Sequence, residues 1–347
     1  MSTYYLANPF RIGIIFGSFF VFTLPFVLFN SYLHLIPYLL YAILLGGTHF
    51  AISFALYLKS DNLRYFASSP QNFLIYFVLP FLLLLFMFLN GLLGLSEMGV
   101  LGVVILSSVK ALDYFHVVRQ HFGVLQLFKL QSMGRFLSVS RHSENYFFIN
   151  MAILQMIVFL QFFGWFPPRY YRAAMTIGIT LAGVLFVLIL VNFALALRGA
   201  KSRISVLVPF SYFLLQTTSA SLPVYRTQFY LASLAMHYIE YHVLIYPRIF
   251  WTPLDPKNIV DRAAFWFRNH WIFFYFLAAL IFAISLGAGS KSHFSAPSGE
   301  KDFLLVFINV FAGINVFHYY IDAFVWKFKK EYYKKTLSPI YFPYGYR

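Results

Sequence analysis

Histidine is the residue type in this sequence with the clearest chemical potential, because six histidines lie inside long apolar segments. A neutral imidazole is costly to leave in lipid, but it is a common metal ligand. Several imidazoles on separate apolar segments therefore predict a buried metal centre. The six candidate metal ligands are His49, His116, His121, His237, His242 and His318.

Four of these histidines are predicted to lie at one depth in a membrane. The number of residues before the first cytoplasmic Lys or Arg is 10 for His49, 13 for His116, 11 for His237 and 9 for His318. At about 1.5 Å per helical residue, the four side chains fall within roughly 6 Å in depth. We therefore expect these four imidazoles to bind the metal.

The other two histidines form a second layer closer to the cytoplasm. His121 and His242 each follow a histidine of the first layer by five residues. On an ideal helix, five residues separate two side chains by about 140°. Both rings of one helix reach a single ion only if the helix bends or the site lies between several helices. Alternatively, the lower pair holds a second ion or supports the first.

Three acids lie inside the predicted spans, each three or four residues from a first-layer histidine, so acid and imidazole share a helix face. They are the candidate catalytic acids Asp113, Glu240 and Asp322. We expect Glu240 to be a direct ligand, whereas Asp322 and Asp113 orient ligand imidazoles through the distal ring N–H. The alternative for Asp113 is an ion pair with Lys110 on its own helix.

The donor set limits the choice of metal. The sequence contains no cysteine, which excludes thiolate ligands, and imidazole with carboxylate suits iron, zinc, copper or nickel. We expect non-haem iron, as one or two ions, with a haem held by two histidines as the alternative. A further alternative is that each histidine is a hydrogen-bonded packing residue of a helical bundle.

Composition predicts the elements that position these residues. Of the 347 residues, 61% are apolar and 11% charged, against roughly 25% charged in soluble domains. We expect an all-α, polytopic transmembrane bundle that forms a single domain over residues 1–347. Its ten predicted spans are 12–29, 35–57, 73–94, 98–128, 146–166, 174–197, 204–222, 227–246, 271–288 and 303–326.

Loop charge predicts the orientation. Of the 26 Lys and Arg residues, 19 fall on one side of these spans and five on the other. This asymmetry predicts that both termini are cytoplasmic, in a multi-pass protein of a bacterial inner membrane. The formal net charge of +15 is explained by loops that face anionic lipid, so we expect no nucleic-acid partner.

Short motifs around the histidines resemble a known class of enzymes. The segments HVVRQH (His116–His121) and HYIEYH (His237–His242) are similar to the first histidine box of fatty-acid desaturases and hydroxylases. GGTHF (Gly46–Phe50) and RQHFG (Arg119–Gly123) resemble glycine–histidine patches of Brp/Blh-type carotene dioxygenases. That family is closer in design, because the later desaturase boxes need adjacent histidines and this chain has none. The resemblance implies a multi-histidine iron site.

These observations predict a membrane-embedded non-haem iron oxygenase of hydroxylase, desaturase or dioxygenase type. Its substrate would be hydrophobic and lipid-like, and a separate cytoplasmic protein would donate electrons. The sequence leaves two other functions open. One is a proton-coupled transporter that uses the same histidines and acids as a relay. The other is a haem-binding electron-transfer subunit.

Overall fold

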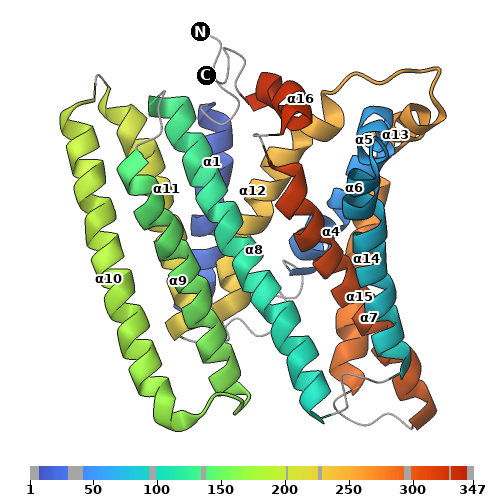
Figure 1. The fold of residues 1–347 in the computed structure, drawn as a ribbon, viewed down its shortest axis with the longest axis horizontal. Coiled ribbons are helices and arrows are strands. Elements are labelled where there is room, and N and C mark those ends of the chain that lie inside the picture. The colour runs from blue at the N-terminus through green and yellow to red at the C-terminus, as the bar shows by residue number, and fades with distance from the viewer. Residues whose placement is uncertain are drawn as a thin grey trace. The chain divides into compact units, whose positions relative to one another are not determined.

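Every regular element of the described chain is a helix (Figure 1). The computed structural model describes residues 8–29, 42–93, 99–133, 138–200, 202–225, 229–292, 298–327 and 330–341. The chain divides into two compact units, each assembled from separated segments. The first unit comprises Met1–Tyr32, Lys110–Val243 and Pro339–Arg347; the second comprises Leu33–Val109 and Leu244–Ser338. The prediction of an all-helical fold is confirmed, and that of a single domain stays a prediction.

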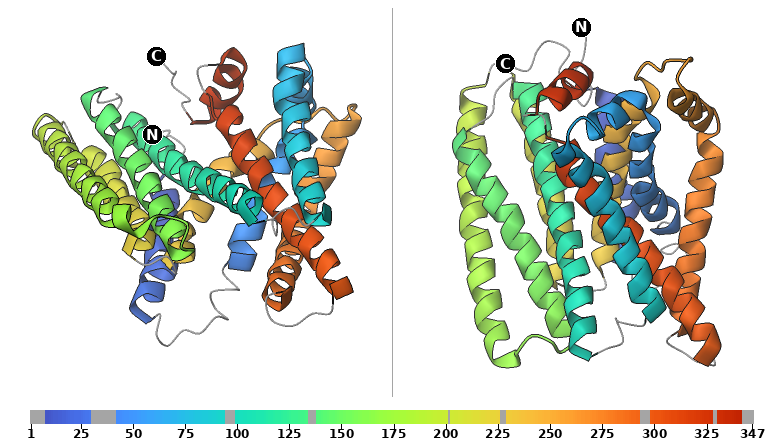
Figure 2. Two further views of the ribbon diagram at one scale, coloured as in Figure 1. Left: turned by 60° about the horizontal axis from the view of Figure 1, so that its bottom comes forward. Right: turned by 45° about the vertical axis from the view of Figure 1, so that its right-hand side comes forward.

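The first unit is built on long helices that approach one another closely. Asn150 on α9 donates a hydrogen bond from Nδ2 to the Gly178 carbonyl of α10, at 2.8 Å. A Cβ at Gly178 would lie 2.5 Å from Cδ2 of Leu154, so a larger residue there would require the Leu154 side chain to move. Figure 2 shows α9 and α10 side by side. The unit contains α1 (Pro9–Ser18), η1 (Phe19–Thr23), α2 (Leu24–Phe29), α9 (Ser138–Phe162), α10 (Pro168–Arg198), α11 (Arg203–Tyr225) and parts of α8 (Gly99–Met133) and α12 (Tyr230–Phe250).

The first unit also contains an ion pair that is closed to solvent. Lys129 of α8 donates from Nζ to Oε1 of Glu144 on α9, and both side chains are 0% exposed. Gln126, one helical turn before Lys129, donates to the other Glu144 oxygen at 2.8 Å. The carboxylate is thus held by two partners on one facing helix, which fixes α9 against α8.

In the second unit, α7 and α15 pack along each other (Figure 2). Asn90 of α7 donates from Nδ2 to the side-chain oxygen of Asn309 on α15. A Cβ at Gly313 would lie 3.0 Å from Met87, so the helices are also close about one turn away from this bond. The unit contains η2 (Ala42–Gly47), α4 (Thr48–Ala51), η3 (Ile52–Leu58), α5 (Ser60–Phe66), α6 (Pro70–Phe73), η4 (Leu74–Val78), α7 (Leu79–Leu93), the start of α8, the last turns of α12, α13 (Ile259–Asn269), α14 (Trp271–Ser292), α15 (Ser298–Val325) and most of α16 (Glu331–Tyr341).

Four described helices are long and apolar enough to cross a membrane, and a bent pair makes a fifth if it counts as one span. They are Pro70–Leu93, Val100–Gln131, Arg141–Phe162 and Pro168–Arg198, with the pair Ile259–Asn269 and Trp271–Ile284 bent by 79°. Helix α12 is not among them; its two histidines and glutamate lower its hydropathy. The ten-span count therefore stays a prediction. Residues 35–41 of the second predicted span and both chain ends lie outside the described residues.

The buried ion pair gives a test of the fold. Glu144→Gln leaves the Lys129 ammonium buried without its counter-ion, so we expect a loss of about 3–5 kcal/mol in stability. Thermal unfolding of the purified protein in detergent measures it. Glu331→Gln is the matched control, because the Lys335–Glu331 pair is 75% and 72% exposed, and its loss should change the unfolding temperature little. Equal unfolding temperatures for wild type and Glu144→Gln would contradict the stabilising role of this pair.

Candidate metal centre

Three of the predicted ligands meet within the first unit. The ring centroids of His116 and His237 lie 5.1 Å apart, and those of His121 and His237 lie 5.8 Å apart. All three side chains are buried. Ring nitrogens of His116 and His237 approach within 4.8 Å of each other, close enough to share one ion. The structure therefore brings together imidazoles that are more than 100 residues apart in the sequence.

The five-residue spacing on α8 is accommodated without a break in the helix. Helix α8 runs uninterrupted from Gly99 to Met133. His116 and His121 point in different directions from α8, but the ring centroid of His237 on the neighbouring helix α12 lies 5.1 Å from the first ring and 5.8 Å from the second. Gln120, between the two α8 histidines, donates from Nε2 to the His237 backbone carbonyl at 2.9 Å. This bond fixes α8 against α12 at the level of the imidazoles.

His121 gives the clearest indication that the cluster is incomplete without a ligand. The side chain is 1% exposed, and neither ring nitrogen has a hydrogen-bond partner among the described residues. A buried polar group without a partner costs free energy, roughly 1–3 kcal/mol. A metal ion bound to one nitrogen would remove part of this cost, because a neutral imidazole offers a lone pair for coordination. His121 itself is outside the groups of converging ligand atoms found among the described residues, so its role as a ligand stays a prediction; His116 and His237 belong to one such group and fit a metal.

Glu240 is held by polar neighbours that sequence reasoning missed. Gln216 of α11 donates from Nε2 to Oε1 of Glu240, and the same amide lies 3.3 Å from the Tyr212 hydroxyl. All three side chains are fully buried. The signal in the sequence was a glutamine directly after the apolar residues Phe213–Leu215. Glu240 is absent from the groups of converging ligand atoms found among the described residues, so its role as a direct ligand stays a prediction.

A second histidine pair lies within the second unit. His49 of α4 and His318 of α15 have ring centroids 4.4 Å apart, and both are 0% exposed. Asp322 lies one turn after His318, with Oδ2 3.9 Å from Nε2, as the four-residue spacing predicts. Ser53 places its hydroxyl 2.6 Å from the other His318 nitrogen, Nδ1. The serine thus leaves Nε2 as the His318 nitrogen that faces the carboxylate.

The helix around His49 changes its type twice. A π-helix over Ala42–Gly47 leads into α4, and a 3-10 helix over Ile52–Leu58 follows it. Such irregular turns are frequent at functional sites. A Cβ at Gly47 would lie 2.5 Å from Cβ of Phe282, so the second glycine of GGTHF allows close packing on α14.

Two predicted site residues have other positions. Asp113 forms an ion pair with Lys110 at 2.6 Å, the alternative that the sequence left open, and the ammonium lies 3.9 Å from the Tyr230 ring centroid. His242 lies on α12 and is outside the groups of converging ligand atoms among the described residues. The supporting role expected for His242 stays a prediction.

No protein-family model, no curated protein and no solved structure matches this chain. The interpretation of the site therefore rests on its own residues. Buried histidine and aspartate side chains are grouped so that they could hold a metal ion. Nitrogen and oxygen donors of this kind suit several metals and do not select one of them.

The serine contact tests whether His318 is a ligand. Ser53→Ala removes the hydrogen bond that orients the His318 ring, so we expect metal affinity to fall about 10–100-fold. Titration of the metal-free protein in detergent measures this affinity. Ser68→Ala is the control, because that hydroxyl is exposed and contacts no histidine: it donates to the Tyr65 carbonyl at 2.7 Å and accepts from Nδ2 of Asn72 at 3.0 Å. Unchanged affinity in Ser53→Ala would remove Ser53 as a positioning residue.

Proposed function

We propose that this chain is a membrane-embedded oxygenase that uses non-haem iron on a hydrophobic, lipid-like substrate. The observation that carries the proposal is the pairing of buried imidazoles on apolar helices. His116 pairs with His237 in the first unit, and His49 pairs with His318 in the second. Two neutral imidazoles in contact gain little from each other, whereas a shared ion would coordinate both. The proposal holds for one ion or for two.

The chemistry of the donors supports iron. Imidazole and carboxylate without thiolate form the ligand set of non-haem iron oxygenases. Bound iron supplies oxygen activation, which acid–base side chains alone do not provide. The protein's own residues hold and orient the donors: Ser53 contacts His318, Gln120 fixes the His237 backbone, and Gln216 holds Glu240. The resemblance of the histidine motifs to membrane oxygenases agrees with this assignment.

The apolar outer surface of the described helices supports a hydrophobic substrate. The described helices carry large exposed apolar side chains along most of their length, as expected for contact with lipid. A lipid-like molecule can reach such a site from within the bilayer. A cytoplasmic electron donor remains part of the proposal, because the sequence contains no nucleotide- or flavin-binding motif of its own.

A proton-coupled transporter is the second candidate. The change from π-helix to α-helix to 3-10 helix around His49 favours it, because transporters place irregular helices at their binding sites. Buried acids and histidines can also relay protons. Substrate uptake into proteoliposomes by metal-free protein would select this candidate over the oxygenase.

Metal analysis of single variants tests the oxygenase proposal. We expect the purified wild type to retain iron, and His237→Ala and His318→Ala each to lose most of it, because each removes one imidazole of a pair. His270→Ala is the control, since His270 is exposed and its Nδ1 lies 2.8 Å from the Trp266 carbonyl. Elemental analysis with an absorption spectrum gives the readout. A Soret band would identify haem instead. Full iron retention in both His237→Ala and His318→Ala would contradict the proposal.

A further inference from the structure

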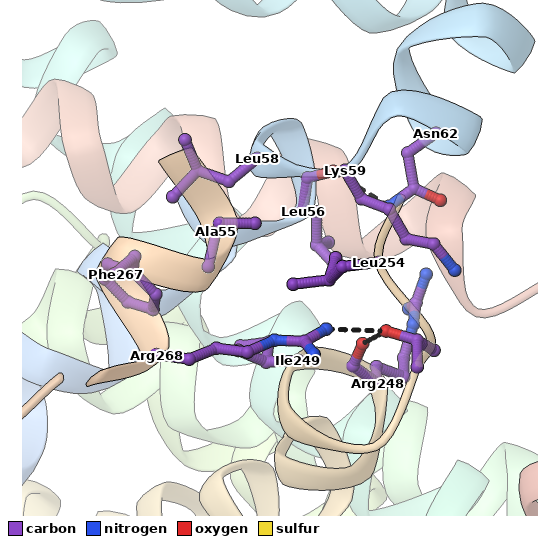
Figure 3. Close-up of a pocket in the computed structure, with 12 residues that line it drawn as sticks. Ala55, Leu56, Leu58, Lys59, Asn62, Arg248, Ile249, Leu254, Phe267 and Arg268 are labelled. Carbon is purple, nitrogen blue, oxygen red and sulfur yellow. Dashed lines mark hydrogen bonds between the residues drawn. The ribbon is translucent and has the colours of Figure 1, made fainter. Parts of the chain in front are cut away.

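A small pocket in the second unit is lined by cations. It lies where η3 ends and beside the last turn of α12, and it encloses about 20 Å³ (Figure 3). Its polar lining consists of Lys59, Asn62, Arg248, Thr252 and Arg268, and no acid lines it. Three positive charges therefore face one space that no carboxylate of the described chain enters.

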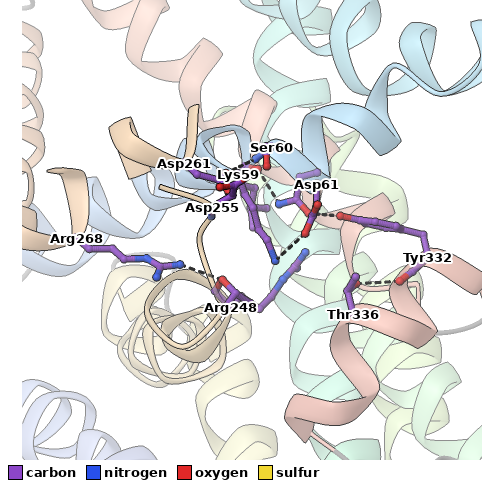
Figure 4. A network of polar contacts seen from close by, with 12 residues as sticks. Lys59, Ser60, Asp61, Arg248, Asp255, Asp261, Arg268, Tyr332 and Thr336 are labelled. Atoms are coloured by element: carbon purple, nitrogen blue, oxygen red, sulfur yellow. Dashed lines mark hydrogen bonds and ion pairs between the residues drawn. The ribbon is translucent and has the colours of Figure 1, made fainter. Parts of the chain in front are cut away.

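The nearest acids are engaged outside the pocket. Asp261 accepts backbone N–H bonds from Ser60 at 2.7 Å and from Asp255 at 2.8 Å. The half-exposed Asp61 places its carboxylate 3.7 Å from the Lys59 ammonium, at the rim of the network in Figure 4. Asp255, the third acid of the network, accepts the Lys257 backbone N–H at 2.9 Å. None of these carboxylates lines the pocket, so its three cations face one another there without an acid between them.

The two guanidinium groups keep unused donors. Arg248 is only 7% exposed; its guanidinium lies 4.9 Å from the Trp326 ring centroid, and the one hydrogen bond it donates to a described residue is a long one, 3.5 Å to the Val325 carbonyl. Arg268 donates from Nη2 to Thr252 at 3.0 Å, while its Nε–H is buried without a partner among the described residues. A guanidinium carries five N–H donors. The pocket thus presents more donors than the protein satisfies.

The charges also act on one another. Burial lowers the pKa of the Lys59 ammonium; Asp61 opposes this effect, and Arg248 lowers the pKa further. Figure 4 shows Lys59 and Arg248 extending toward the same space. Like charges held together in a partly buried site repel each other, and a bound anion would offset this repulsion by attracting each cation.

The neighbouring helix indicates where the anion comes from. Helix α13 carries Arg268 and bends by 79° from the apolar helix that follows it. Its outer side exposes Phe265 by 61% and Trp266 by 55%. Exposed aromatic side chains on a short amphipathic helix are typical of the membrane interface. The predicted cytoplasmic side of Lys59, Arg248 and Arg268 faces the leaflet that carries anionic lipids.

We propose that this pocket binds the phosphate group of an anionic membrane lipid. Arginine and lysine are the usual partners of phosphate oxygens. A cavity of about 20 Å³ holds one or two oxygen atoms. The phosphate therefore inserts its free oxygens between the cations, and its ester substituents remain at the opening. This site is separate from the histidine pairs, and it stands whether or not the protein is an oxygenase.

Lipid protection of the full chain tests the proposal. Dioctanoyl phosphatidylglycerol added to the detergent-purified protein should raise the thermal unfolding midpoint, and dioctanoyl phosphatidylcholine should not. The apparent affinity should fall on the order of tenfold in Lys59→Gln and in Arg268→Gln, since each removes one charge-assisted contact. Arg262→Gln, on the exposed side of α13, is the matched control and should bind like the wild type. Using two partly exposed positions avoids dependence on Arg248, whose replacement risks misfolding.

Three results would overturn the proposal. The first is equal protection by the zwitterionic lipid. The second is unchanged affinity in both pocket variants, or an equal loss in Arg262→Gln, which would indicate a general surface-charge effect. The third is protection by inorganic phosphate as strong as that by the anionic lipid, which would make the ligand a soluble phosphate.

Discussion

The constraint on which this structure depends is that a polar side chain inside an apolar helical bundle needs a specific partner. Water cannot satisfy such a group, and an unsatisfied one costs free energy comparable to a large share of a protein's net stability. The interior meets this constraint pair by pair across helices. Lys129 meets Glu144, Asn90 meets Asn309, and Gln216 meets Glu240. Each pair determines which two helix faces pack together. Apolar surfaces alone would allow several packing arrangements of similar free energy.

Small residues make this specificity possible at close range. Gly178 lets α10 approach Leu154 of α9, and Gly47 lets the segment before His49 approach Phe282 of α14. Without a Cβ at these positions, the backbones come near enough for short side chains and carbonyls to form hydrogen bonds. The helices that carry the histidines are thus held by close backbone contacts and by paired polar side chains.

The same need for a partner distinguishes the buried imidazoles from one another. His318 has a serine on one nitrogen and an aspartate near the other, which fixes its ring. His121 has neither. In the second unit the chain leaves the apolar region within ten residues of His49 and reaches the cations of the basic pocket. In the second unit the buried imidazoles and the cations of the pocket therefore lie in successive parts of the same chain segment.

The sequence by itself determined the helical class, the apolar segments and the residues that share a face of one helix. Asp322 near His318 and Lys110 near Asp113 follow from helix periodicity, which acts within a few residues. Only the tertiary structure decided which helices meet. The contacts of Ser53 with His318 and of Gln216 with Glu240 join distant segments, as does the convergence of Lys59, Arg248 and Arg268. Only the structure shows that no described residue forms a hydrogen bond with the ring nitrogens of His121. The reason is that helical hydrogen bonds are local, whereas the pairing of helix faces depends on the packing of the whole chain.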